Sequence, residues 1–182
     1  MKKLLTAIAG AAMAATTLVA VPTSATAAPY CGLVWGSLAE RSTFVSTTAT
    51  VRNVRAGQHT CYDRLVIDLR GNLRGYDVRY VTAVYTEGQG LRVPLLGAAD
   101  LRIIVNAPSY NINTGASTYS PSNRNNIVNV AGYRTFRQAA FLGSFEGQSS
   151  FGLGVRARLP FRTFLLKDAT TTRLVIDVAH RW

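Results

Sequence analysis

The word Arg64-Leu65-Val66-Ile67-Asp68 is repeated near the end of this chain as Arg173-Leu174-Val175-Ile176-Asp177. Because successive side chains of a β-strand point to opposite faces of its sheet, each copy predicts an amphipathic strand. We expect one face to pack on the core through Leu65, Ile67, Leu69, Leu174, Ile176 and Val178. We expect the other face to point outward and to carry Arg64, Val66, Asp68, Arg173, Val175 and Asp177.

Two interpretations of this repeat fit the residues. Two strands can share a common amphipathic pattern by chance, or the chain can contain two similar half-domains that pack together. We favour the second, which gives the fold internal pseudo-symmetry. Under either interpretation, an Arg and an Asp four residues apart on one strand face lie too far apart to pair easily. Each should therefore pair with a side chain of a neighbouring strand.

Short strands separated by turns continue along the chain. Alternating or β-branched residues predict strands at 48–55, 76–85, 101–105, 151–159 and 161–166, and one or two more within 127–145. Pro160 interrupts the ladder, so the strand after it should lie at a sheet edge or begin after a bulge. We find no convincing helix of three turns after residue 27. This pattern is typical of an all-β sandwich or barrel.

The first 27 residues have the layout of a secretory signal peptide. Lys2 and Lys3 precede an uncharged run at 4–21, and the segment ends in the small residues Ala25-Thr26-Ala27. An uncleaved membrane anchor is the alternative, because the apolar run approaches the ~18 residues that suggest a spanning helix. The small-residue exit favours cleavage, and hence a secreted protein without stable membrane insertion.

Cleavage after Ala27 would leave 182 minus 27, or 155, residues, which is enough for one core. We therefore expect a signal peptide at 1–27, an N-terminal lead-in at 28–48 and a single β-sandwich domain at 49–182. The mature protein should lie outside the cell or in its envelope.

The charge of the chain is strongly positive. Removing Lys2 and Lys3 from 20 basic residues leaves 18 against 9 acidic ones, so the mature net charge is +9. Lys167 is the one remaining lysine and the other 17 basic residues are Arg, whose planar fork matches carboxylates and phosphates. A basic secreted domain points to an anionic polymer as its partner. Genome composition and solubility are alternative causes of the excess.

Cys31 and Cys61 are the two cysteines of the chain, and a secreted protein meets conditions that favour disulfides. We expect them to pair and to clip the mature N-terminus onto the entrance of the first repeated strand. Two separate reactive thiols are the alternative.

Catalytic residues are scarce. A hydrolytic zinc site needs about three protein ligands. The candidates are His59, His180, Glu40, Glu87 and Glu146. The sequence has no Gly-x-Ser-x-Gly elbow for a serine triad. Glu146 could pair with one of six Asp in a glycosidase site, although isolated carboxylates in an Arg-rich chain are more often ion-pair partners. We expect no catalysis, no metal site and no cofactor.

One predicted strand supplies a better binding face. On its outward side we expect Gly152 and Gly154 to form a flat floor, followed by Arg156 and Arg158 as bidentate donors. Glycines inside a strand often mark the close approach of a ligand or of another backbone. The alternative is that the glycines ease a bend and the arginines are merely solvated. We add Arg162, in the following strand, as a fifth binding residue.

The segment 106–126 is rich in Asn, Ser and Thr and carries Arg124 as its single charge. With Pro108, Gly115 and Pro121, this composition predicts a long loop. Loops of this length inside a domain are usually functional or disordered, and both possibilities stay open from the residues alone.

The two repeated strands, the strand at 76–85 and the run from Phe151 to Phe161 resemble the AMIN-like domain of secreted actinobacterial proteins. That domain is related to the AMIN module of cell-wall amidases and secretins. The resemblance covers nearly all of 49–182, and its most specific marker is the Arg-x-Val-x-Asp strand. It implies a β-sandwich of two antiparallel sheets that docks on peptidoglycan or other envelope components without catalysis. It supplies no set of ligand residues, and with no catalytic domain in the sequence it does not imply the positioning of an attached enzyme.

We therefore expect a secreted, non-catalytic domain that binds cell-envelope polymer, either peptidoglycan or an associated anionic glycan, and no nucleic acid. Two alternatives remain. One is a small secreted glycan hydrolase that uses a carboxylate pair, and the other is a protein-interaction or inhibitor module whose 106–126 loop contacts a partner.

Overall fold

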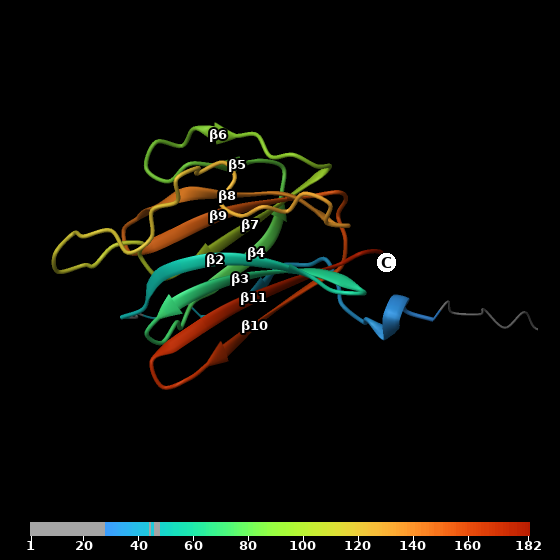
Figure 1. Ribbon diagram of the computed structural model, residues 1–182, viewed down its shortest axis with the longest axis horizontal. Coiled ribbons are helices and arrows are strands. Elements are labelled where there is room, and N and C mark those ends of the chain that lie inside the picture. The colour runs from blue at the N-terminus through green and yellow to red at the C-terminus, as the bar shows by residue number, and fades with distance from the viewer. Residues whose placement is uncertain (1–27, 44, 46–47) are drawn as a thin grey trace, which may run out of the picture.

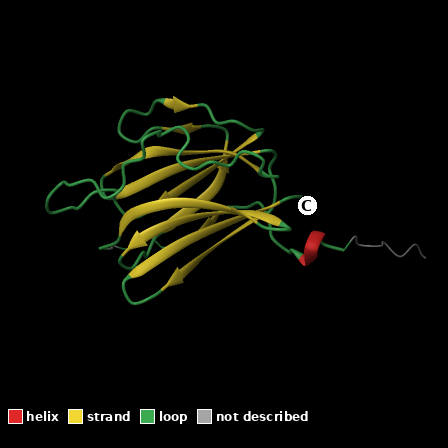
Figure 2. Cartoon of the chain, in the orientation of Figure 1, coloured by secondary structure: helices red, strands yellow, loops and turns green. Residues whose placement is uncertain are grey.

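The structure is a computed structural model and describes residues 28–182 apart from 44, 46 and 47. The signal peptide expected at 1–27 lies outside these residues. Within them, two antiparallel sheets pack face to face, and the only helical element is the short 3₁₀ turn η1 (Tyr30–Gly32) (Figures 1 and 2). The predicted all-β sandwich is therefore confirmed.

The larger sheet has five strands, in the order β1 (Glu40–Arg41), β4 (Tyr76–Val81), β7 (Ala99–Val105), β9 (Gln148–Val155) and β8 (Phe136–Phe145). The smaller sheet has four, in the order β10 (Phe161–Lys167), β11 (Thr171–Ala179), β3 (Tyr62–Arg70) and β2 (Thr50–Gln58). A two-stranded ribbon of β5 (Val84–Tyr85) and β6 (Arg92–Val93) is separate from both sheets.

The two copies of the repeated word lie side by side as β11 and β3, the central strands of the smaller sheet. They run antiparallel in a register that places Arg64 opposite Asp177 and Asp68 opposite Arg173. The word is thus complementary to its own reversed copy, because each Arg faces the Asp of the other copy.

The charged ends of the word form ion pairs. These are Arg64–Asp177, Arg55–Asp68 and Arg173–Asp168, with closest N–O distances of 2.6, 2.8 and 3.7 Å. The first two cross to a neighbouring strand as predicted, whereas the third stays within the β10–β11 hairpin.

All six side chains predicted to face the core are at most 2% exposed. Val66, Val175 and Asp177 lie on the opposite face as predicted, but they are not exposed there, because each is at most 5% exposed. Val175 and Val66 occupy the middle of a cross-strand row that Phe164 and Arg55 complete on the edge strands. Each of the two valines therefore has a cross-strand neighbour on both sides.

The strand predicted at 76–85 is too long, because β4 ends at Val81. The chain then crosses the outer face of the larger sheet, where Val84 packs against Ala140 and Leu142 in a second apolar cluster. The period of two correctly places Val78 and Val84 inside, but it does not predict that Asp77 is buried or that Thr82 is exposed where the chain changes face.

Three other boundaries follow from the structure. The strand predicted at 151–159 ends as β9 at Val155, so Arg156 and Arg158 lie beyond it. The stretch 127–145 contains one strand, β8. β10 follows Pro160 and is an edge strand, which is one of the two predicted alternatives.

The 106–126 loop and its continuation to residue 135 close one open side of the sandwich, between β2 and β8 (Figure 1). Thr118 Oγ1 donates to the Val51 carbonyl at 2.8 Å, and the Ile127 N–H donates to the Ala139 carbonyl at 2.9 Å. Tyr119 packs edge-on against Phe141, with 5.3 Å between ring centroids. The loop is therefore an ordered part of the domain.

The lead-in, which includes β1, closes the opposite side, between β4 and β10. The Phe161 N–H donates to the Gly36 carbonyl at 2.8 Å, and the Thr163 N–H donates to Glu40 Oε2 at 2.6 Å. These bonds satisfy donors on the edge of β10 that would otherwise be available to another strand.

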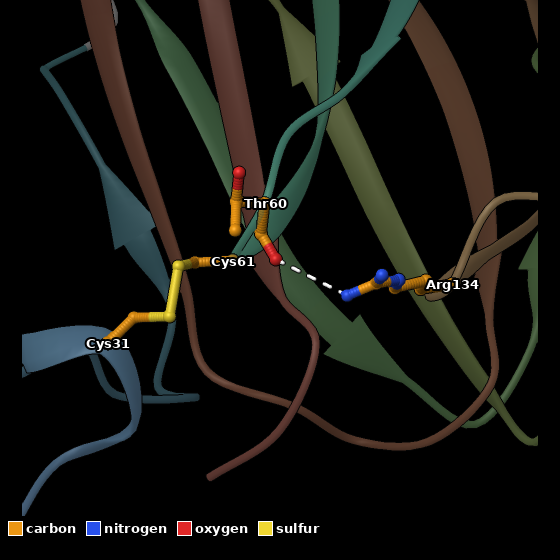
Figure 3. Close-up of a disulfide and its surroundings, with 4 residues drawn as sticks. All are labelled: Cys31, Thr60, Cys61 and Arg134. Carbon is orange, nitrogen blue, oxygen red and sulfur yellow. Dashed lines mark hydrogen bonds between the residues drawn. A yellow bond between two sulfur atoms is a disulfide. The ribbon is translucent and has the colours of Figure 1, made fainter.

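Cys31 and Cys61 form the predicted disulfide, with 6.2 Å between their Cα atoms. Figure 3 shows the bridge joining η1 to the turn before β3. Thr60 lies in the same turn, and its carbonyl accepts a hydrogen bond of 3.5 Å from Arg134 Nη1. The disulfide thus links the lead-in covalently to the smaller sheet.

Replacing both cysteines with Ala should lower the free energy of unfolding by about 3 to 4 kcal/mol, the chain-entropy value for a loop closed over 30 residues. Urea unfolding of the double variant, compared with reduced and oxidised wild type, measures this. Equal midpoints in all three samples would show that the bridge does not constrain the unfolded chain.

Leu65→Ala or Ile176→Ala should each cost about 2 to 5 kcal/mol, because each removes fully buried methyl groups. Val175→Thr should cost about 1 to 3 kcal/mol, since it places a hydroxyl in a buried position. The matched control is Val34→Thr, because Val34 is 85% exposed. Equal costs at Val175 and Val34 would contradict the burial of the outer face.

Candidate functional site

The flat glycine floor predicted from the sequence is wrong. Gly152 and Gly154 are buried beneath the segment that follows β6. A Cβ atom on Gly154 would lie 2.1 Å from the Leu96 carbonyl oxygen, and one on Gly152 would lie 2.9 Å from Leu95 Cδ1. The glycines therefore admit the protein's own chain at close range, which leaves no room for a ligand on this part of the strand.

Arg156 and Arg158 are exposed, but each is already bonded to the protein. Arg156 donates to the His180 carbonyl. Arg158 donates through Nε to Ser37 Oγ at 3.2 Å and through Nη2 to the Ser37 carbonyl at 3.0 Å, and its guanidinium lies 5.3 Å from the Tyr80 ring centroid. The two arginines help to hold the lead-in and the last residues of the chain against the sandwich.

Arg162 lies elsewhere, on the outer face of the smaller sheet. Its Nε donates to Asp177 Oδ2 at 3.0 Å, while Arg64 Nε donates to Asp177 Oδ1 at 2.6 Å. The Asp177 side chain is fully buried between the two guanidinium groups. Arg162 also stacks on Trp35, 4.5 Å from the ring centroid. The five predicted binding residues are therefore not gathered in one site.

Two adjoining clefts of about 590 and 660 Å³ at one end of the smaller sheet have Arg52, Arg70 and Thr170 in common. Arg70 is the last residue of β3 and lies opposite Thr50 on β2 and Thr171 on β11. We call this shared concave surface the Arg52–Arg70 cleft.

Arg52 reaches the cleft through a β-bulge. Val51 lies opposite Leu69 and Asn53 lies opposite Asp68, so Arg52 is the extra residue between two paired positions. A bulge bends its strand and redirects the extra side chain. The 106–126 loop binds beside it, because the Val51 N–H donates to the Pro108 carbonyl at 2.9 Å.

Hydroxyl and amide side chains dominate the rest of the lining. They are Thr48, Thr50, Asn111, Asn113, Thr118, Thr170, Thr171 and Thr172. Thr170 belongs to the β10–β11 turn, which Asp168 stabilises. The Thr171 hydroxyl and the N–H groups of Thr170 and Thr171 donate to Asp168, and these hydrogen bonds lower the pKa of its carboxyl.

The side chains of Arg52 and Arg70 have no ion pair or hydrogen bond to a described residue. Five other arginines bind carboxylates, namely Arg55, Arg64, Arg79, Arg162 and Arg173. The one carboxylate in the lining, Asp68, is engaged by Arg55 through hydrogen bonds of 2.8 and 3.1 Å. The cleft therefore presents two guanidinium groups with no internal counter-charge assigned to them.

This arrangement suits the binding of an anion. Each guanidinium can hold a phosphate or carboxylate through two parallel bonds, and the Asn and Thr side chains can bond to sugar hydroxyls. Glu146, the acid of the alternative glycosidase, lines an adjoining cleft of about 200 Å³, which shares Thr48, Thr50 and Ile112 with the 660 Å³ cleft and contains no aspartate. In the part of the chain that the structure describes, no three His, Cys, Asp or Glu side chains are grouped to hold a metal ion.

The family model of the AMIN-like domain matches residues 49–180. The chain belongs to the AMIN-like family. The match includes both repeated strands as well as Arg52 and Arg70, and it confirms the resemblance seen in the sequence. Membership indicates a cell-wall-related module of a generally non-catalytic kind. No curated protein and no solved structure matches the chain.

Two observations, the disulfide and the family membership, bear on the location of this AMIN-like protein. A disulfide and membership of this family fit a protein of the cell envelope or the exterior. Among the residues that the structure describes, no helix has the length and apolarity to cross a membrane.

Sequence reasoning missed Arg52 and Arg70. Arg70 continues the outward alternation of the first repeated strand, so its face was predictable. Arg52 was not, because a bulge depends on the pairing register of two strands and leaves no fixed signal in one of them.

Asp177→Ala should cost about 2 to 4 kcal/mol, because it leaves two guanidinium groups without their shared partner. Arg162→Ala should cost about 1 kcal/mol, since the 41% exposure of its side chain weakens the pair. Urea unfolding measures both. If Arg162→Ala left the stability unchanged but abolished binding to purified cell wall, Arg162 would be a binding residue as the sequence predicted.

Proposed function

We propose that this AMIN-like protein is secreted and acts as a non-catalytic module that binds an anionic polymer of the cell envelope in the Arg52–Arg70 cleft. Phosphates of wall teichoic acids and carboxylates of peptidoglycan peptides both suit a pair of guanidinium forks. The neighbouring Thr and Asn side chains would bond to the hydroxyls that such polymers carry.

One observation carries the proposal: Arg52 and Arg70 share a concave surface and have no carboxylate partner among the described residues. An arginine already paired with a carboxylate must exchange that partner for a ligand, whereas an unpaired one needs only to lose water. The bulge at Arg52 adds weight, because bulges are frequent beside functional sites and the loop bound there keeps it in place.

The net charge of the mature chain, +9 after removal of 1–27, would add a second, diffuse attraction. Such attraction concentrates the protein near an anionic wall and weakens as salt rises. Variants that remove the same number of charges inside and outside the cleft are therefore needed to distinguish binding in the cleft from diffuse attraction.

Mature protein should sediment with purified cell wall, and Arg52→Ala combined with Arg70→Ala should weaken that binding by about tenfold or more, because two charge-assisted contacts are lost. Both arginines are exposed, so the melting temperature should change little. Binding isotherms from sedimentation, measured at two salt concentrations, test this.

The charge-matched control is Arg41→Ala with Arg74→Ala, since both side chains are exposed and neither lines the cleft. Arg156→Ala with Arg158→Ala tests the site predicted from the sequence in the same assay. An equal loss in the control pair would show diffuse attraction only. Failure of wild type to sediment with wall would overturn the proposed function, and walls stripped of teichoic acid would separate phosphate from carboxylate as the bound group.

A further inference from the structure

A second cleft, of about 610 Å³, shares no lining residue with the Arg52–Arg70 cleft. It lies where the ends of β4 and the start of β7 meet the segment that follows β6. Its lining includes Tyr80, Arg92, Leu95, Asp100 and Arg158. We call it the Asp100 cleft.

The wall of the Asp100 cleft is held in place by close backbone packing. Gly97 has φ of 118°, and a Cβ there would lie 2.4 Å from the Val155 carbonyl oxygen. The Ala98 N–H donates to that same carbonyl at 2.9 Å, and the Leu96 N–H donates to Gln138 Oε1 at 2.7 Å. Because Gly154 admits Leu96 at contact distance, the glycines predicted to form a binding floor shape this cleft from behind.

Asp100 lies in the cleft without a hydrogen-bond donor among the described residues. The chain has nine acidic residues, and seven of them accept hydrogen bonds: Glu40, Asp63, Asp68, Asp77, Glu87, Asp168 and Asp177. Asp100 and Glu146 are the two that do not. Asp100 is half-buried, and burial raises the pKa of its carboxyl against the opposing effect of Arg92. A partly desolvated carboxylate with no donor is costly to maintain.

Arg158 supplies the opposite charge in a fixed position. Its Nε and Nη2 are bonded to Ser37 and its guanidinium plane lies over Tyr80, which leaves Nη1 with its two N–H groups unassigned. The cleft thus presents a carboxylate that has no hydrogen-bond donor, with Arg92 as a nearby positive charge, and an anchored guanidinium donor. Arg92 is exposed on the same lining and forms no ion pair with a described residue.

We propose that the Asp100 cleft binds a short peptide in its zwitterionic form, with the ligand ammonium on Asp100 and the ligand carboxylate on Arg158. The volume lies within the range of small-ligand sites, which favours a ligand of a few residues. A purely anionic polymer would leave Asp100 without a partner and would face repulsion from it. The ligand class therefore differs from that of the Arg52–Arg70 cleft.

Three probes test this proposal: alanyl-alanine, its N-acetyl derivative and its C-terminal amide. Each is titrated into the mature protein, and binding is followed by the backbone amide NMR shifts of the protein. The zwitterion should bind with a dissociation constant near or below about 10 mM. Removing either charge should weaken binding about tenfold, because one charge-assisted contact is lost. Equal binding of the N-acetyl derivative, or no binding of alanyl-alanine at about 10 mM, would overturn the proposal.

Asp100→Asn should abolish the preference for the free amino group over the acetylated one. The matched control is Glu146→Gln, which removes the other carboxylate without a donor and should leave the preference intact. Arg158→Ala should remove the preference for the free carboxylate, whereas Arg156→Ala, outside the lining, should keep it. Loss of preference in Glu146→Gln would overturn the assignment to Asp100.

The melting temperature of Asp100→Asn gives a readout that distinguishes a binding role from a structural one. Because the carboxylate is partly desolvated and accepts no hydrogen bond, its removal should leave the melting temperature unchanged or higher. A clear fall would show that Asp100 supports the fold and would count against a binding role.

Discussion

The pairing of the repeated word with its own reversed copy is the constraint on which the rest of the sandwich depends. Arg64 faces Asp177 across β3 and β11, and the same register places six apolar side chains of the two strands on the core. A slip of β11 by one residue relative to β3 would turn Asp177 toward the core and Ile176 toward the outer face, so charge pairing and burial select the same register. The buried Asp177 then needs Arg162 on β10 as its second donor, which ties the edge strand to this centre.

The two segments that close the sides of the sandwich also shape its clefts. The 106–126 loop binds β2 beside the bulge and brings Asn111, Asn113 and Thr118 to the Arg52–Arg70 cleft. The lead-in, held by its disulfide and by Gly36, places Ser37 where it fixes Arg158 at the Asp100 cleft. Segments without regular secondary structure thus contribute to stability and shape both clefts through the same contacts, an arrangement that is common where loops are mounted on a rigid scaffold.

Sequence reasoning succeeded where one strand and one face decide the outcome. The inward residues of the repeated word and the Cys31–Cys61 bridge were predictable, and the edge position of β10 after Pro160 was one of two predicted alternatives. It failed where two segments must be placed against each other. Val175 is buried by side chains of neighbouring strands, and Arg52 reaches its cleft through a bulge defined by β3. Neither the cross-strand neighbours nor the register can be inferred from the alternation of a single strand.

The glycine and arginine signals show why composition alone could not locate the clefts. Gly152 and Gly154 do mark a close approach, but of the protein's own chain, because an absent Cβ is equally useful to a ligand and to a packed backbone. An excess of arginine over acidic residues implies that some guanidinium groups lack an acidic partner, but it does not identify those arginines. Once five arginines are assigned to carboxylates, Arg52 and Arg70 remain together in one cleft, and Asp100 remains without a donor in another. Partial burial without a hydrogen-bond donor disfavours the Asp100 carboxylate, and the charge of Arg92 offsets only part of that cost. A ligand ammonium would supply the missing donors.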